Sequence, residues 1–69
     1  MNSHRAITVS KPDIANHADV FSRLSELSSK VEETDDEFVF HPQPAQTLLM
    51  LVMLKDKGLQ HKLVNLSLH

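Results

Sequence analysis

The first informative pattern of hydrophobic and polar positions lies in residues 5–10, where Ile7 and Val9 alternate with small or polar residues. Alternation of period two with β-branched side chains predicts a short, half-buried strand. A helix start is predicted directly after it, because Ser10 can cap free amide groups and Pro12 fits a first helical turn.

From there to Val31 the apolar residues recur at steps of three and four. They are Ile14, Ala18, Phe21, Leu24, Leu27 and Val31. This spacing predicts a long amphipathic helix over residues 12–33. Two acid-before-base pairs at i, i+4, Asp19 with Arg23 and Glu26 with Lys30, favour the same helix.

An acidic segment follows, and acids oppose the dipole at a helix C-terminus. Its members are Glu32, Glu33, Asp35, Asp36 and Glu37. We therefore expect the helix to end in a solvated turn there. Phe38–Phe40 then predicts a second short strand with both phenylalanines on one face. Residues 41–44 contain two prolines and predict a corner.

The next segment, residues 45–57, predicts a helix that ends at Gly58, a residue suited to the left-handed position after a helix. This helix is apolar on every side, through Leu48, Leu49, Met50, Leu51, Val52, Met53 and Leu54. An all-apolar helix needs cover on all sides, and a chain this short is not expected to supply it. The sequence therefore predicts a homodimer or an obligate partner, with these residues, Phe38 and Phe40 at the interface.

The fold class predicted is a small α+β single domain over residues 1–69, in the order short strand, long helix, short strand, apolar helix. The first strand would pair with Phe38–Phe40 of the same or the opposite chain. An all-α helical hairpin is the alternative. For the tail we favour a short helix over residues 59–66, although Val64, Leu66 and Leu68 alternate as in a strand. Residues 1–4 and 67–69 are expected to be mobile.

Composition narrows the functional classes. The 69 residues include no cysteine and one glycine, which excludes disulfides, thiolate metal sites and a glycine-rich phosphate loop. The net charge of −2 predicts no strong attraction to nucleic acid or to an anionic membrane. No apolar run approaches the roughly 20 residues of a membrane span, and no secretory signal pattern is present. A cytoplasmic location is the expectation.

No catalytic residue, metal ligand or cofactor site is predicted. The five histidines, His4, His17, His41, His61 and His69, include no pair spaced i, i+3 or i, i+4, the spacing that places two ligands on one helix face. No serine stands in a nucleophile elbow. Beyond a solvated turn, the acidic segment could serve as an electrostatic docking patch for a basic partner.

A strand, a proline and an amphipathic helix resemble, in outline, the start of ribbon-helix-helix repressors. The matching residues are Arg5 to Ser10, Pro12 and the helix to Val31, less than half of the chain. The resemblance implies a dimeric DNA-binding regulator with a paired β-ribbon in the major groove. The chain departs from that pattern because the outward strand residues, Ala6, Thr8 and Ser10, include no basic side chain to contact bases.

The function predicted first is a non-enzymatic interaction module that binds another protein and modulates it, chiefly by inhibition. The target would be a protein such as a transcription regulator or an ATPase. Size and composition resemble those of small bacterial or phage-encoded adaptors and host-takeover proteins, a likeness of class without a matched motif. The DNA-binding regulator is the alternative, and a structural subunit of a larger assembly is the second alternative.

Overall fold

Four strands and three helices make up the chain, whose computed structural model describes the backbone of residues 2–68 and the side chains of residues 5–65. The elements are β1 (Asn2–Ser10), α1 (Lys11–Ile14), α2 (Ala18–Glu26), β2 (Ser28–Glu33), β3 (Glu37–Pro42), α3 (Thr47–Asp56) and β4 (His61–Leu68). The strands form one antiparallel sheet in the order β2-β3-β1-β4. Each helical connection passes over an inserted strand, which is the split β-α-β arrangement.

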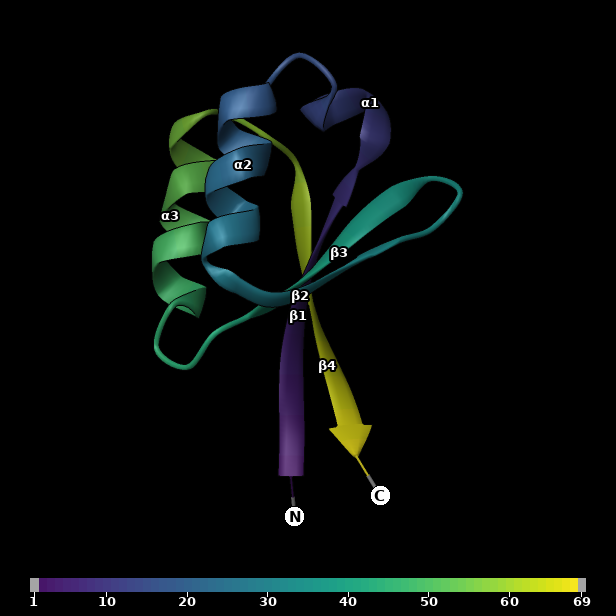
Figure 1. The fold of residues 1–69 in the computed structure, drawn as a ribbon, viewed down its shortest axis with the longest axis vertical. Helices are drawn as coiled ribbons and strands as arrows, with labels where there is room; N and C mark the ends of the chain where they lie inside the picture. The colour runs from purple at the N-terminus through teal and green to yellow at the C-terminus, as the bar shows by residue number, and fades with distance from the viewer. Residues whose placement is uncertain (1, 69) are drawn as a thin grey trace.

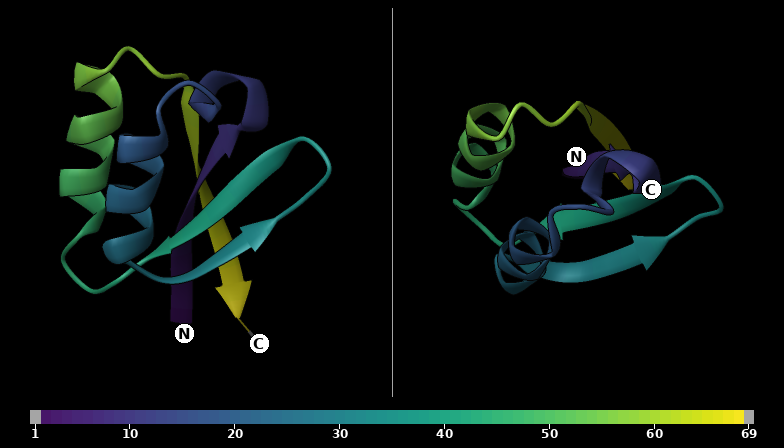
Figure 2. Two further views of the ribbon diagram at one scale, coloured as in Figure 1. Left: turned by 45° about the horizontal axis from the view of Figure 1, so that its top comes forward. Right: turned by 90° about the horizontal axis from the view of Figure 1, so that it is seen from above.

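Both longer helices cover the same face of this twisted sheet, with α2 on the β2–β3 side and α3 on the β1–β4 side (Figures 1 and 2). The core lies between the sheet and the helices. Its buried members are Ile7, Val9, Ile14, Val20, Leu24, Phe40, Met50, Leu54 and Leu59. The fold class predicted from the sequence is therefore wrong, both in its strand–long helix–strand–helix order and in its all-α alternative.

The predicted pairing of the first strand with Phe38–Phe40 is present within one chain, with Ile7 opposite Phe40 and Val9 opposite Phe38. Residues that face one another on adjacent antiparallel strands share a face of the sheet. Phe38 and Phe40 therefore both point toward the helices, where Phe21 meets each ring edge-on at 4.8 and 5.7 Å.

The predicted helix over residues 12–33 is wrong. The chain turns after α1, α2 ends at Glu26, and the Ser28 hydroxyl donates a hydrogen bond to the Leu24 carbonyl at the junction with β2. Residues 28–33 are a strand because they form a hairpin ladder with β3, in which Val31 lies opposite Phe40. The strand ladder outweighs a helical spacing that these six residues also satisfy.

The predicted helix in the tail is also wrong, because the chain from His61 pairs with β1 along its whole length. The ladder of β4 covers Asn2 to Val9, whereas β3 pairs only with the end of β1 from Ile7. The first half of β1 and the last half of β4 thus project as a two-stranded ribbon (Figure 1), and the molecule measures 38 × 26 × 17 Å.

The ends expected to be mobile lie mostly in this ribbon. Residues 2–4 belong to the backbone of β1 and residues 67–68 to that of β4. Met1 and His69 lie outside the described residues. In the described part of the chain, no helix combines the length and hydropathy that crossing a membrane demands.

The apolar helix is present, although it begins at Thr47 rather than at residue 45. The corner before it starts at Gln43, since His41 and Pro42 still belong to β3. Gly58 takes the left-handed conformation expected of it, with φ of 69°. The amides of Gly58 and Leu59 then donate to the carbonyls of Lys55 and Leu54, at 3.0 and 2.9 Å, which closes the helix in a Schellman motif.

Candidate functional site

The apolar segment predicted as an interface is divided by the fold into an inner and an outer side. Met50 and Leu54 are fully buried between α3, the sheet and α2, and Leu51 and Met53 are half-buried at the flanks of the helix. On the outer side the exposed fractions are 72% for Leu48, 45% for Leu49 and 55% for Val52. We call these three residues the outer face of α3.

The spacing of the outer face makes it one continuous stripe. Val52 lies four residues after Leu48 and three after Leu49, so the three side chains are neighbours on the helix surface. They are three of the five large apolar residues found exposed among the described side chains, with Val31 and Leu63 on the sheet. Neighbouring exposed apolar side chains of this kind mark interaction sites more often than scattered single ones do.

Phe38 and Phe40 do not join this surface. Phe40 is fully buried, and Phe38 is half-buried against Phe21 and beneath the Lys11 ammonium, which lies 5.5 Å from the centre of its ring. Both rings serve the packing of α2 on the sheet. Met50 and Leu54 are likewise buried in the core between the sheet and the helices, so one chain covers them without a partner.

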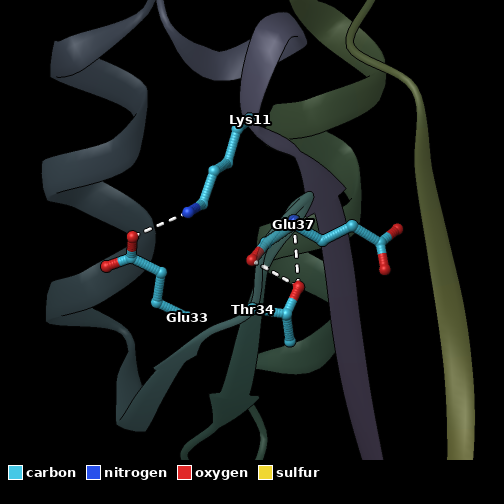
Figure 3. A network of polar contacts seen from close by, with 4 residues as sticks. All are labelled: Lys11, Glu33, Thr34 and Glu37. Carbon is cyan, nitrogen blue, oxygen red and sulfur yellow. Dashed lines mark hydrogen bonds and ion pairs between the residues drawn. The ribbon is translucent and has the colours of Figure 1, made fainter.

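The acidic residues lie at and near the hairpin between β2 and β3, close to the start of α1 (Figure 3). Thr34 closes this hairpin, since its Oγ1 accepts a hydrogen bond from the Glu37 amide at 3.0 Å and donates to the Glu37 carbonyl at 3.1 Å. Lys11 holds the hairpin on the body, through its amide to the Asp36 carbonyl and its ammonium to Glu33 at 2.7 Å. The carboxylate of Glu33 is thus already engaged within the chain.

Glu32 is engaged on the opposite, helix-free face. Its carboxylate accepts a hydrogen bond from Nε2 of His41 at 2.5 Å and lies 3.9 Å from the Lys30 ammonium. The hydrogen bond with His41 and, to a smaller degree, the charge of Lys30 hold the pKa of this carboxyl below its ordinary value of 4.5. The predicted acidic patch is therefore split between two faces, with Asp35 and Asp36 exposed at the hairpin tip.

The helix-free face of the sheet bears on the DNA-binding alternative. A row across it consists of Glu32, Val39, Thr8 and Lys62. The three phenylalanines, the only aromatic residues of the Phe, Tyr and Trp type, all lie on the helix side. Among the described side chains of this face, the one ring is the imidazole of His41, which is buried and hydrogen-bonded to Glu32, so no exposed aromatic ring is available for a base to stack on.

The position of β1 bears on the same alternative. Over Ile7 to Val9 the strand is paired with β3 on one side and with β4 on the other. A ribbon-helix-helix dimer needs this strand to pair with its copy in a second chain. Along the described ladder, both edges of that stretch are occupied within one chain.

A hollow of about 530 Å³ lies where β1 ends and β4 begins. Its lining residues are Thr8, Ser10, Asp13, Glu37, Leu59, Gln60, His61 and Lys62. The Ser10 hydroxyl donates to the Asp13 carboxylate at 3.1 Å, and His61 Nδ1 donates to the Leu59 carbonyl at 2.9 Å. These bonds tie the Ser10 hydroxyl to Asp13 and one imidazole nitrogen of His61 to the main chain.

Metal binding finds no support in the same region. Among the side chains that the structure describes, no group of three or more His, Cys, Asp or Glu residues is placed to hold an ion. Structural and catalytic zinc sites have at least that many protein ligands.

One exposed residue escaped the analysis of the sequence. Leu63, 42% exposed, lies on the helix-side face of β4 at the free edge of the sheet. The tail was predicted as a helix, which concealed that edge. The alternation of Val64, Leu66 and Leu68 was the signal that could have revealed it.

No protein-family model, curated protein or solved structure matches the chain. The functional argument therefore depends on the surfaces described above, and the split β-α-β arrangement does not by itself assign a function.

Proposed function

We propose that this chain is a non-enzymatic interaction module that binds another protein through the outer face of α3 and modulates it, chiefly by inhibition. One observation carries the proposal: Leu48, Leu49 and Val52 form a continuous exposed stripe on a helix whose inner side is already packed. Burying an apolar side chain of this size is worth about 1.5–3 kcal/mol, so a partner that covers the stripe gains substantially.

The stripe favours a partner with an apolar groove. A helix that lays an apolar face into a hydrophobic groove presents anchors at spacings of three and four, as these residues do. Charged residues follow only at the C-terminal end of α3, with Lys55, Asp56 and Lys57 exposed there. Such a rim beside an apolar centre is the usual composition of protein interfaces.

The exposed Asp35 and Asp36 at the hairpin tip support a secondary electrostatic contact with a basic surface. Such a contact would act on the association rate and weaken with salt. A transcription regulator or an ATPase remains the proposed kind of target, by the likeness of class to small bacterial and phage adaptors. The absence of cysteine supports a cytoplasmic setting.

The test is a pull-down from host lysate after nuclease treatment, with the bound protein identified by mass spectrometry. The variant Leu48→Lys/Val52→Lys places two charges in the stripe without touching the core. Ser22→Lys/Glu26→Lys is the matched control, because both residues are exposed at the same spacing on α2. Circular dichroism verifies that both variants remain folded.

We expect the α3 variant to lower the yield of the captured protein at least tenfold, as the loss of a central apolar anchor does. The α2 variant should capture it as the parent does. Equal capture by both variants would contradict the proposal, and recovery of nucleic acid in place of a protein would favour the DNA-binding regulator. Precipitation of the parent chain expressed alone would favour the structural subunit.

A further inference from the structure

The two edges of the sheet differ in how they are protected. The edge strand β2 is six residues long, carries the charges of Lys30, Glu32 and Glu33, and has a register shift between Ser28 and Lys30. Charges, short length and bulges are the means by which sheet edges avoid pairing with other chains. The β2 edge has all three.

The β4 edge is neither short nor bulged, and it carries a single charged residue. It is eight residues long, and the continuous ladder with β1 runs from His61 to Leu68 without a register shift. Lys62 is its only lysine, arginine or acidic residue. The helix-side face of this edge exposes Leu63. A long, regular, nearly uncharged edge is a template for another strand.

The projecting ribbon adds a second, independent observation. Beyond the point where β3 leaves the sheet, Asn2–Ala6 of β1 are paired with β4 alone. A two-stranded ribbon is only marginally stable in water by itself, and a third strand is normally needed. The free side of β4 is where that strand can be added.

We propose that β4 pairs antiparallel with β4 of a second copy of this chain, so that the two four-stranded sheets join into one continuous sheet. The pairing is isologous, with a two-fold axis perpendicular to the sheet. Because the strands run antiparallel, the projecting half of each ribbon lies beside the globular half of the other copy. The β4–β4 pairing thus gives each ribbon a third strand and covers Leu63 on the helix side.

The edge fits its own copy in length and in charge. An antiparallel register centred on Asn65 pairs residues 62–68 of the two strands with matching faces together, and it places the two Lys62 side chains at opposite ends of the ladder. A 69-residue chain without disulfides is also of the size for which a second subunit commonly supplies the missing burial. The seam is at β4, whereas the sequence placed it on the apolar helix.

The dimer is independent of the proposed binding function. The outer face of α3 is opposite the side that packs on the sheet, so it points away from the sheet rather than along it. Both copies of α3 would lie on the same side of the joined sheet and present two docking faces to partners. A two-site arrangement of this kind raises the avidity for a multivalent target without any new contact.

Sedimentation equilibrium of the purified chain tests the proposal with one matched pair of variants. Leu63 and Val31 lie in the same row across the sheet, through Ile7 and Phe40, but at opposite edges. Both are partly exposed, by 42% and 36%. Leu63→Lys should weaken the dimer at least tenfold, because it places a charge in the seam of each copy, and Val31→Lys should leave it unchanged.

The absence of native cysteine allows a second readout that does not depend on affinity. Under mild oxidation, Asn65→Cys should form a covalent dimer, since residues near the centre of a self-paired strand approach their own copies. Val31→Cys should form no covalent dimer. A monomeric parent chain, or equal effects of the two lysine variants, would overturn the proposal.

The lysine variants also separate this proposal from the proposed function. Loss of the dimer on Val52→Lys but not on Leu63→Lys would place the seam on α3 and overturn the β4 pairing. A monomeric Leu63→Lys chain that still captures the partner would support the β4 pairing and leave the docking role of α3 intact.

Discussion

Helices α2 and α3 pack on the sheet in the same way, but their solvent-facing sides differ. Each buries one pair of residues four apart, Val20 and Leu24 in α2, Met50 and Leu54 in α3. The exposed positions of α2 are polar apart from one alanine and include Asp19, Ser22, Arg23 and Glu26. The exposed positions of α3 include Leu48, Leu49 and Val52.

The strands beside these helices repeat the contrast. On the α2 side the edge strand β2 is short, charged and bulged, and on the α3 side β4 is long, regular and nearly uncharged (Figure 2). Packing inside the core does not explain this difference, since both helices pack alike. The contrast shows that the polar residues and the protected edge lie on the α2–β2 side, whereas the exposed apolar stripe and the open edge lie on the α3–β4 side, which supports the proposal that the α3–β4 side binds protein.

The largest effect separates the two sides of α3 itself. Leu54→Ala should lower the free energy of unfolding by about 2–5 kcal/mol, because it leaves a cavity at a fully buried position. Val52→Ala, two residues earlier and 55% exposed, should change it by less than about 0.5 kcal/mol. Urea denaturation of both variants measures the difference. Similar losses of unfolding free energy for both variants would contradict the assignment of Val52 to an exposed outer face.

A smaller effect concerns the entry to α3. Ala45 has a positive φ of 69°, a left-handed conformation that costs a residue with a β-carbon about 1–2 kcal/mol. Ala45→Gly should therefore raise the free energy of unfolding by about 1 kcal/mol, part of the gain being offset by the greater freedom of glycine in the unfolded chain. Thermal unfolding would show it as a rise in Tm, and a fall in Tm would contradict the assigned conformation.

On the α2–β2 side, the Thr34 side chain closes the hairpin between β2 and β3. Thr34→Ala removes both hydrogen bonds of its hydroxyl with Glu37. Because the turn is exposed, we expect a loss of about 0.5–1.5 kcal/mol in the free energy of unfolding. Thr34→Ser keeps the hydroxyl and is the control. Chemical denaturation that ranks alanine and serine equally would exclude a role for the hydroxyl.

The smallest effect depends on pH. The pKa of Glu32 is held below its ordinary value of 4.5, mainly by the hydrogen bond with His41, so the ionised carboxylate stabilises the fold above that pH. This contribution is lost as the pH falls through the lowered pKa. Glu32→Gln should be slightly less stable than the parent near pH 6.5, and this difference should shrink as the pH falls through the lowered pKa of Glu32. Denaturation curves measure the free energy of unfolding of the parent and of Glu32→Gln near pH 6.5 and in acid. An equal difference between the two proteins at both pH values would contradict this assignment.

Part of the fold could be predicted from local patterns. The alternation around Ile7 and Val9, the short strand of Phe38–Phe40 and the glycine after α3 each encode a structure through neighbouring residues. Residues 28–33 and 61–68 could not be predicted in the same way. Both satisfy a helical spacing, although Val64, Leu66 and Leu68 also alternate as in a strand. Their strand conformation is decided by hydrogen bonds to β3 and β1.

The outer face of α3 could be predicted only in part, because contacts between distant parts of the chain decide which residues are exposed. The apolar character of Leu48 to Leu54 indicated a helix in need of cover. Which of its residues remain exposed depends on where the sheet and α2 lie, and β4 supplies one edge of that sheet. Because the tail was predicted as a helix, with the strand only as its alternative, the free edge and Leu63 were not identified from the sequence.

Site-directed photo-crosslinking tests the contrast between the two halves most directly. A photoreactive phenylalanine replaces either Val52 on α3 or Ser22 on α2, both exposed, and the purified chain is irradiated in host lysate. We expect a discrete protein adduct from position 52 and none from position 22. Equal adducts from both positions, or an adduct from position 22 alone, would contradict the assignment of the contact side to α3.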